Sequence, residues 1–185
     1  MRVHNLHERS LRATPAQVWD LIASLASAND RLWPVENWPR MKLDRALGVG
    51  ASGGHGPIRY VVDAYSRESG IVLFRFTTPL GFDGDHRFEL RRINDHSVLL
   101  RHVLEMRTSG WARLTWPLIF RPLHDALVED GLARAETEVG MTPRIRPWSP
   151  WVKLLRHLIA GADAHRQTSP RPLSPASLAV SANDT

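Results

Sequence analysis

Residues 12–24 read RATPAQVWDLIAS, a stretch that is typical of a capped amphipathic helix. Thr14 is a favourable N-cap, Pro15 suits the first helical position, and Gln17 lies where the partner of a capping box belongs. Apolar residues then recur at helical spacing, at Val18, Trp19, Leu21, Ile22 and Leu25. The preceding VHNLHERSL is typical of a strand, so the sequence predicts a strand that runs directly into a short helix.

Two irregular stretches follow this helix. Residues 29–41, NDRLWPVENWPRM, contain two Trp-Pro pairs, and proline disfavours helix in the residue before it. This stretch therefore predicts a second short helix or an irregular lid. Five glycines between Gly48 and Gly56 then predict a turn or a mobile hairpin loop.

Four extended segments come next, and the sequence predicts an antiparallel meander over residues 58–66, 70–80, 83–93 and 96–108. Their separators, RESG, GFDG and ND, have the length and the residues of hairpin turns. The segment at 70–80 is apolar on both faces, and alternation does not assign its core side. In the other three, alternation assigns one mostly apolar face: Ile58, Tyr60, Val62, Ala64, His86, Phe88, Leu90, Val98, Leu100, His102, Leu104 and Met106.

Residues 109–140 predict one long helix near the end of the chain. Pro117 and Pro122 imply that its regular part starts late or is kinked near the beginning. Its apolar stripe consists of Leu114, Leu118, Ile119, Leu123, Ala126, Leu127 and Ala133. A strand, small helices, a meander and one long helix make an α+β protein. The sheet must cover its apolar face, and curling around the long helix is the simplest way to do so.

Composition and charge exclude several kinds of site and argue against one kind of partner. The chain has 185 residues, is 43% apolar and contains no cysteine, so disulfides and thiolate metal sites are excluded. It shows no secretory signal and no run apolar and long enough to span a bilayer, and we expect a cytoplasmic location. Residues 1–142 hold 18 basic and 17 acidic side chains, whereas residues 143–185 hold six and two. The nearly neutral domain argues against nucleic-acid binding.

Three regions are predicted. Residues 1–142 form the folded domain, residues 143–166 form a basic amphipathic helical extension, and residues 167–185 form a disordered tail rich in proline and serine.

The sequence resembles the START/polyketide cyclase superfamily, also called SRPBCC, which has the helix-grip fold. Thr14, Pro15, Val18 and Trp19 match the small-Pro-x-x-Val-Trp helix start of that family. DGDHRFELRRINDHSVLLRHVLEM resembles its paired strands before the final helix, and PLIFRPLHDALVEDGLARAE resembles that helix. The resemblance covers about residues 3–140. It implies a curved antiparallel sheet wrapped around a long C-terminal helix, with two short helices after the first strand.

The resemblance also implies a hydrophobic cavity between helix and sheet. Members of the family bind lipids, sterols, polyketides, plant hormones or quinones there, and some catalyse cyclisation or aromatisation. No catalytic signature of the family can be carried over to this chain, so analogy of fold extends only to binding of an apolar molecule.

His86 and His102 are the first candidate site residues, because both point to the apolar face of neighbouring strands. Two neutral imidazoles in a cavity can orient a carbonyl or hydroxyl, or act as general acid and base. The alternative, histidines bonded to backbone or water, is favoured because buried polar groups generally have structural partners. No metal and no cofactor is predicted, since two histidines without a third ligand do not make a metal site.

Aromatic and apolar side chains complete the predicted ligand site. For each of them, plain core packing is an equally good interpretation. The set is Trp33, Trp38, Tyr60, Phe74, Phe76, His86, Phe88, His102, Leu104 and Leu123.

Several other groups are assigned structural roles. Glu36 is interpreted as a solvated loop acid, and His124, Asp125, Glu129 and Asp130 as a solvated helix face. The glycines of residues 48–56 lack the Lys-Ser/Thr of a phosphate loop and are interpreted as a flexible cavity rim.

These inferences favour binding of a small hydrophobic or amphipathic ligand, such as a lipid, a quinone or a polyketide-like molecule. Two alternatives stay open: a cyclase- or aromatase-like enzyme on the same scaffold, and an interaction module acting through the C-terminal helix. That helix, Trp148 to His165, is also a candidate for weak contact with an anionic membrane, although docking on the domain or on a second subunit is favoured. The sequence does not determine the oligomeric state.

Overall fold

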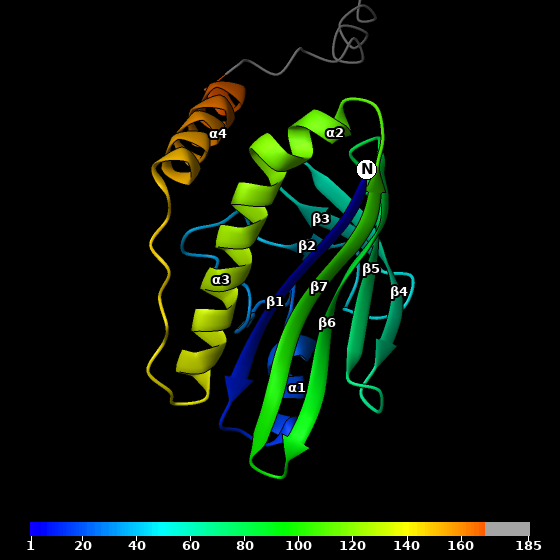
Figure 1. Ribbon diagram of the computed structural model, residues 1–185, viewed down its shortest axis with the longest axis vertical. Helices are drawn as coiled ribbons and strands as arrows, with labels where there is room; N and C mark the ends of the chain where they lie inside the picture. Colours follow the sequence, from blue (N-terminus) through cyan, green and yellow to red (C-terminus); the bar gives the residue numbers. More distant parts are fainter. Residues whose placement is uncertain (169–185) are drawn as a thin grey trace, which may run out of the picture.

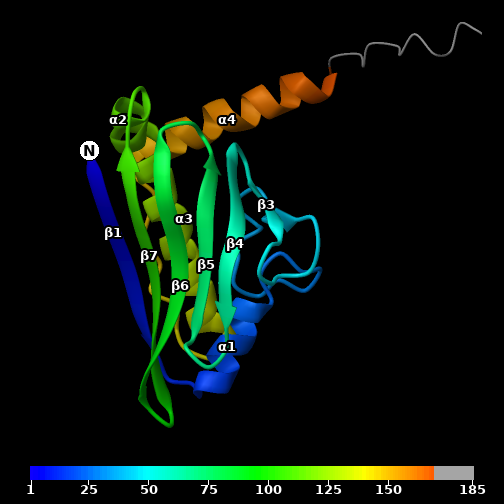
Figure 2. The ribbon, with the colours of Figure 1, turned by 90° about the vertical axis from the view of Figure 1, so that its right-hand side faces the viewer.

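The computed structural model describes residues 1–168, with side chains for residues 1–159. A curved antiparallel sheet faces one long helix (Figures 1 and 2), which confirms the α+β class and the predicted architecture. The elements are β1 (Arg2–Leu11), α1 (Pro15–Ala23), β2 (Lys42–Leu43), β3 (Ser52–His55), β4 (Ile58–Ser66), β5 (Ile71–Thr78), β6 (Phe82–Asn94), β7 (Ser97–Thr108), α2 (Ala112–Thr115), a π-helical turn (Trp116–Phe120), α3 (Arg121–Glu138) and α4 (Pro150–Thr168).

The first helix forms as the sequence predicts. The Thr14 hydroxyl accepts from the Gln17 backbone N–H at 3.3 Å, and the Gln17 side chain accepts from the Thr14 backbone N–H at 2.9 Å. The stretch after α1 forms turns and not a second helix. Its backbone donors are satisfied by Asp30, whose carboxylate accepts from the N–H groups of Ala26, Leu32 and Trp33.

The sheet has seven strands in the order β1-β7-β6-β5-β4-β3-β2, all antiparallel. Two of them are missing from the sequence prediction, because β2 is very short and β3 lies within the glycine-rich stretch. A Cβ at Gly53 or Gly54 would lie about 2 Å from a backbone oxygen of the neighbouring strand, so glycine permits this close pairing. The stretch is therefore a sheet edge and not a free loop.

The inner face of the sheet follows the predicted alternation with one correction. In β4, Val62 pairs with Phe74 but Ala64 pairs with Leu73, so one extra residue forms a β-bulge. Beyond the bulge Tyr65 and not Ala64 faces inward, and its ring packs 5.3 Å from that of Trp19. The pairing also resolves β5, whose inward side chains are Val72, Phe74 and Phe76.

The long helix is continuous from Ala112 to Glu138 but not regular. A π-helical turn carries Pro117, and Pro122 stands in the first turn of α3, where a missing N–H costs little. The predicted stripe is buried only in its later part. Its first members, Leu114, Leu118 and Ile119, are exposed.

Polar side chains join β1 to α3, where the sequence predicted a solvated helix face. That expectation is wrong for two of the helix acids, because β1 turns polar residues inward. Asn5 Nδ2 donates to Asp125 at 2.9 Å, and Arg9 Nη2 donates to Glu129 at 2.6 Å. Glu136, fully buried, lies 3.5 Å from Arg9 Nε. We call this set of contacts the β1–α3 polar seam.

The last helix, α4, packs by its first half at the α2 end of the molecule (Figures 1 and 2). Val152 and Leu155 are buried, and Trp151 Nε1 donates to the carbonyl of Leu118 at 2.7 Å. Residues 167 and 168 belong to α4, and the rest of the predicted tail lies outside the described residues. No helix within residues 1–168 combines the length and hydropathy that a membrane-spanning segment needs.

Candidate ligand-binding cavity

A cavity of about 270 Å³ lies between the inner face of the sheet and the long helix. Its walls come from β5, β6 and β7 on one side and from the π-helical turn and α3 on the other. The turns after α1, the β3–β4 turn and α4 close the remaining sides. Nearly all of the lining is carbon, and the polar side chains that reach it are His55, His86, His102, His124 and Arg156.

Seven of the ten predicted ligand residues line this cavity: Trp33, Trp38, Phe76, His86, His102, Leu104 and Leu123. The other three, Tyr60, Phe74 and Phe88, are buried behind the lining. They pack against the lining histidines, since Phe74 stacks on His86 at 5.0 Å and Phe88 meets His102 edge-on at 4.8 Å. Ligand binding by the set stays a prediction.

His86 and His102 form a pair at the inner wall. His86 Nδ1 lies 3.2 Å from His102 Nε2, a hydrogen bond in which one ring donates to the other. Their remaining nitrogens, His86 Nε2 and His102 Nδ1, are buried and have no hydrogen-bond partner. Burial, with a smaller contribution from neighbouring histidines, holds both pKa values well below the ordinary value, so both rings are neutral at pH 7.

Two further histidines line the cavity. His55 was not singled out in the sequence, and the interpretation of His124 as part of a solvated helix face is wrong, because its ring turns toward the sheet. His55 comes from β3, and its Nδ1 lies 3.2 Å from the hydroxyl of Tyr60. Burial lowers the pKa of His55 to about 3. His124 comes from α3 and lies with its ring centroid 5.0 Å from that of His102. Helical spacing from Leu123 and Leu127 could have placed His124 at the cavity, whereas no local signal marked His55.

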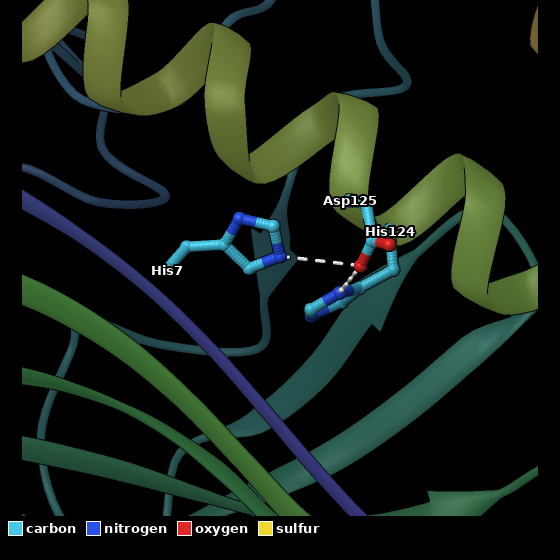
Figure 3. A group of neighbouring side chains, drawn as sticks. All are labelled: His7, His124 and Asp125. Atoms are coloured by element: carbon cyan, nitrogen blue, oxygen red, sulfur yellow. Dashed lines mark hydrogen bonds and ion pairs between the residues drawn. The ribbon is translucent and has the colours of Figure 1, made fainter.

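His124 also belongs to a second cluster, with His7 of β1 and Asp125 (Figure 3). His7 Nε2 lies 3.2 Å from Asp125 Oδ1, and His124 Nδ1 lies 3.5 Å from the same oxygen. Burial alone would lower the pKa of His7, but hydrogen bonds and charges from Asp125 and Glu129 outweigh it and raise that pKa. The pKa of His7 is therefore shifted in the opposite direction to those of the neutral His86–His102 pair at the inner wall.

The α4 helix forms part of the cavity wall. Arg156 and Ile159 line the cavity, and the Arg156 guanidinium lies 4.8 Å above the ring of Trp38. Arg156 Nη2 also donates to the carbonyl of Asn37 at 2.6 Å. Glu36, next in sequence, is a half-solvated loop acid that pairs with Arg134 at 2.6 Å and does not reach the cavity.

No protein-family model matches the chain, and no curated protein matches it in sequence. Similar solved structures include a Thermobifida fusca protein, with a TM-score of 0.58 at 12% identity over 77% of this chain and 99% of that one. Truncated norcoclaurine synthase from Thalictrum flavum gives 0.56 at 15% identity, over 71% of this chain and 91% of its own. The same enzyme in complex with dopamine and hydroxybenzaldehyde gives 0.53 at 14% identity, over 75% and 88%.

The chain has the helix-grip fold. Its sheet and its long helix are the two layers that enclose the cavity.

Proposed function

We propose that this chain is a member of the START/SRPBCC superfamily and binds a small apolar or amphipathic molecule in the helix-grip cavity. The observation that supports this most is a carbon-lined space of about 270 Å³ whose wall includes His86 and His102, each with one buried ring nitrogen that has no hydrogen-bond partner. Burial of ligand carbon would contribute about 25 cal/mol per Å² of apolar area. The dopamine and hydroxybenzaldehyde bound to norcoclaurine synthase show the size of molecule that this fold accommodates elsewhere.

The unpartnered nitrogens indicate which ligands the cavity would select. A neutral imidazole nitrogen either donates to a carbonyl or accepts from a hydroxyl. His86 and His102 can offer one of each because their shared hydrogen bond fixes one nitrogen of each ring. We therefore propose a ligand with an apolar body and one or two oxygen substituents, such as a quinone or a polyketide-like aromatic.

Filling the cavity tests this proposal. Leu123→Trp places an indole into the space, and we expect it to abolish binding of anilinonaphthalene sulfonate, followed by dye fluorescence. Ile93→Trp adds the same side chain at an exposed position near the end of β6, outside the cavity lining, and should leave dye binding unchanged. Equal binding to both variants would show that the dye, and by extension a ligand, does not enter this cavity.

A cyclase- or aromatase-like activity is the second candidate, and the His86–His102 pair favours it. A neutral pair in an apolar site can take a proton at one nitrogen and deliver one at the other. The remaining alternative is an interaction module acting through the C-terminal helix. In such a module we expect the protein's own side chains to fill the space between helix and sheet. The open volume therefore argues against it.

We further propose that the cavity mouth contacts anionic membranes. Trp148 packs 5.2 Å from Trp38 and donates to Asp130, which makes it part of the domain. A different set of apolar side chains is exposed at the α2 end of the molecule, and Trp111 among them is 82% exposed. This mouth patch consists of Trp111, Leu114, Leu118, Trp151, Leu154 and Leu158.

The charge of the mouth patch favours an anionic surface. Residues 106–124 and 139–162 contain no aspartate or glutamate, and Arg113, Arg121 and Lys153 are exposed among them. Each basic side chain near an anionic leaflet contributes about 1 kcal/mol. The patch borders the cavity, because Trp116 and Ile159 line it from the same helices.

We expect Trp111→Asp with Leu118→Asp to reduce sedimentation with phosphatidylserine-containing vesicles at least about tenfold. Ile93→Asp alters an equally exposed apolar side chain in the β6–β7 hairpin, at the other end of the molecule (Figure 1), and should bind as the parent does. Vesicles of phosphatidylcholine alone should bind weakly. Undiminished sedimentation of the double variant would refute the contact.

A further inference from the structure

We propose that His7, His124 and Asp125 form a binding site for a divalent transition-metal ion where β1 meets α3 (Figure 3). Among the residues whose side chains the structure describes, these three form a group of potential metal ligands. Their ligand atoms all lie within 4.8 Å of one another. It stands apart from the His86–His102 pair, which lacks a third ligand. The proposal does not require the cavity to bind an organic molecule.

The spacing of the ligand atoms suits a metal ion. Zinc binds imidazole nitrogen and carboxylate oxygen at about 2.0–2.2 Å, which puts neighbouring ligand atoms of a tetrahedral site about 3.4 Å apart. The observed separations are 3.2 Å from His7 Nε2 to Asp125 Oδ1 and 3.5 Å from His124 Nδ1 to Asp125 Oδ1. Two histidines and one carboxylate suit Zn²⁺, Fe²⁺ and Co²⁺ and leave at least one coordination position for another molecule.

The surroundings of the cluster resemble the outer shell of metal sites. A metal-binding histidine generally donates its second nitrogen to a carboxylate, which fixes the ring and raises its basicity. His7 Nδ1 makes this contact with Glu129 Oε1 at 2.7 Å. Arg9 in turn holds Glu129 Oε2 at 2.6 Å, so the orienting carboxylate is itself fixed.

Unpartnered buried atoms point to a missing occupant. Both nitrogens of His124 are buried; Nε2 has no partner, and Nδ1 has only the long 3.5 Å contact with Asp125, although a neutral imidazole always carries one N–H donor. Metal binding at Nδ1 would leave Nε2 as the N–H of the ring. Asn5 is 8% exposed, and its Oδ1 also lacks a partner while its Nδ2 donates to Asp125. A metal-bound water could donate to that oxygen.

Rigid elements supply all the ligands. His7 stands opposite His102 in the register of β1 and β7, at the middle of the paired strands. His124 and Asp125 are adjacent on α3, which packs on β1. Ligands on paired strands and a long helix are held in place before the ion binds, and this reduces the entropy cost of binding.

Zinc titration of the full, tag-free chain after chelator treatment tests the site. We expect calorimetry to give one Zn²⁺ per chain, with affinity reduced at least about tenfold by His124→Gln and by Asp125→Asn. Glu129→Gln, which replaces the orienting carboxylate but keeps all three ligands, should weaken binding by about 10- to 100-fold. His4→Gln alters an exposed histidine paired with Glu105 and should bind as the parent does.

A measurement on the parent chain keeps the test decisive where a variant fails to fold. Paramagnetic Co²⁺ should shift or broaden the ring NMR signals of His7 and His124 before those of His4 and His96. Absence of stoichiometric Zn²⁺ binding would overturn the proposal. Affinity unchanged by His124→Gln and Asp125→Asn, or Co²⁺ effects confined to exposed histidines, would do the same.

Discussion

Replacing Arg9 by methionine is expected to lower the free energy of unfolding by about 3–5 kcal/mol, because it removes the buried cation that faces two buried carboxylates. Arg9 is 6% exposed and lies 2.6 Å from Glu129 and 3.5 Å from Glu136. Glu136 still contacts Arg144 at 2.8 Å in the variant. That arginine is largely exposed, so it stabilises the buried carboxylate less than Arg9 does. Methionine keeps the length and apolar contacts of the stem, so the change isolates the lost charge.

Arg75→Met is the matched control for this variant. Arg75 also contacts a carboxylate at 2.6 Å, in Asp63, but both side chains are more than one-third exposed. An exposed pair contributes about 0–1 kcal/mol, so urea unfolding should separate the two variants clearly. Equal losses of stability would mean that the β1–α3 polar seam is as solvated as the outer face of the sheet.

Mild acid is expected to destabilise the protein more steeply than its carboxylates alone can explain. His86 and His102 have pKa values well below the ordinary histidine value of 6.5 because they are buried. Below about pH 6.5 the unfolded chain binds protons that the folded chain does not, so stability falls as the pH falls. Each such group contributes up to about 1.4 kcal/mol per pH unit.

His55 and His124, whose pKa values burial also lowers, act in the same window with the same sign. His7 and Glu129 act with the opposite sign or outside this window. The pKa of His7 is raised, so its contribution is fully present below pH 6.5 and is lost as pH rises through its folded pKa. The pKa of Glu129 is lowered by His7 and Arg9 against the effect of burial, and its stabilisation is lost only below about pH 4.5. Histidine burial therefore dominates between pH 6.5 and 4.5.

Urea unfolding across this range measures the slope directly. His86→Leu removes one buried imidazole and should reduce the slope by about one proton, or about 1.4 kcal/mol per pH unit. His96→Leu, at an exposed position in the β6–β7 turn, should leave the slope unchanged. An identical slope in the parent and both variants would mean that His86 is not held neutral in the folded state.

Local patterns predicted α1 and much of the inner sheet face correctly. The capping box at Thr14 needs only residues three positions apart, and alternation in β7 needs only the pleat of one strand. The face of Ala64 was wrong because a bulge shifts the register, and a bulge depends on the partner strand. The strand β2 was missed because it is only two residues long, and β3 because its glycines carry no hydrophobic signal.

The histidines of the candidate site also include some that local patterns predicted and some that they did not. His86 and His102 were placed together because each follows the alternation of its own strand and a tight turn sets their pairing. His7 was not singled out, since the inward face of β1 is polar where a core strand is normally apolar. The role proposed for His7 depends on its contacts with Asp125 and Glu129, which lie more than a hundred residues away in the chain.

The sequence by itself determined the order of elements, the first helix with its cap, and which side of β6 and β7 meets the core, because those features follow from backbone geometry and side-chain periodicity over a few residues. The tertiary structure alone decided that β1 and α3 bury a network of charges, that five histidines gather around one helix, and that a space remains beside them. Such features depend on how separate surfaces dock. A charged side chain is stable in the interior only when a distant partner meets it there, and no local pattern carries that information.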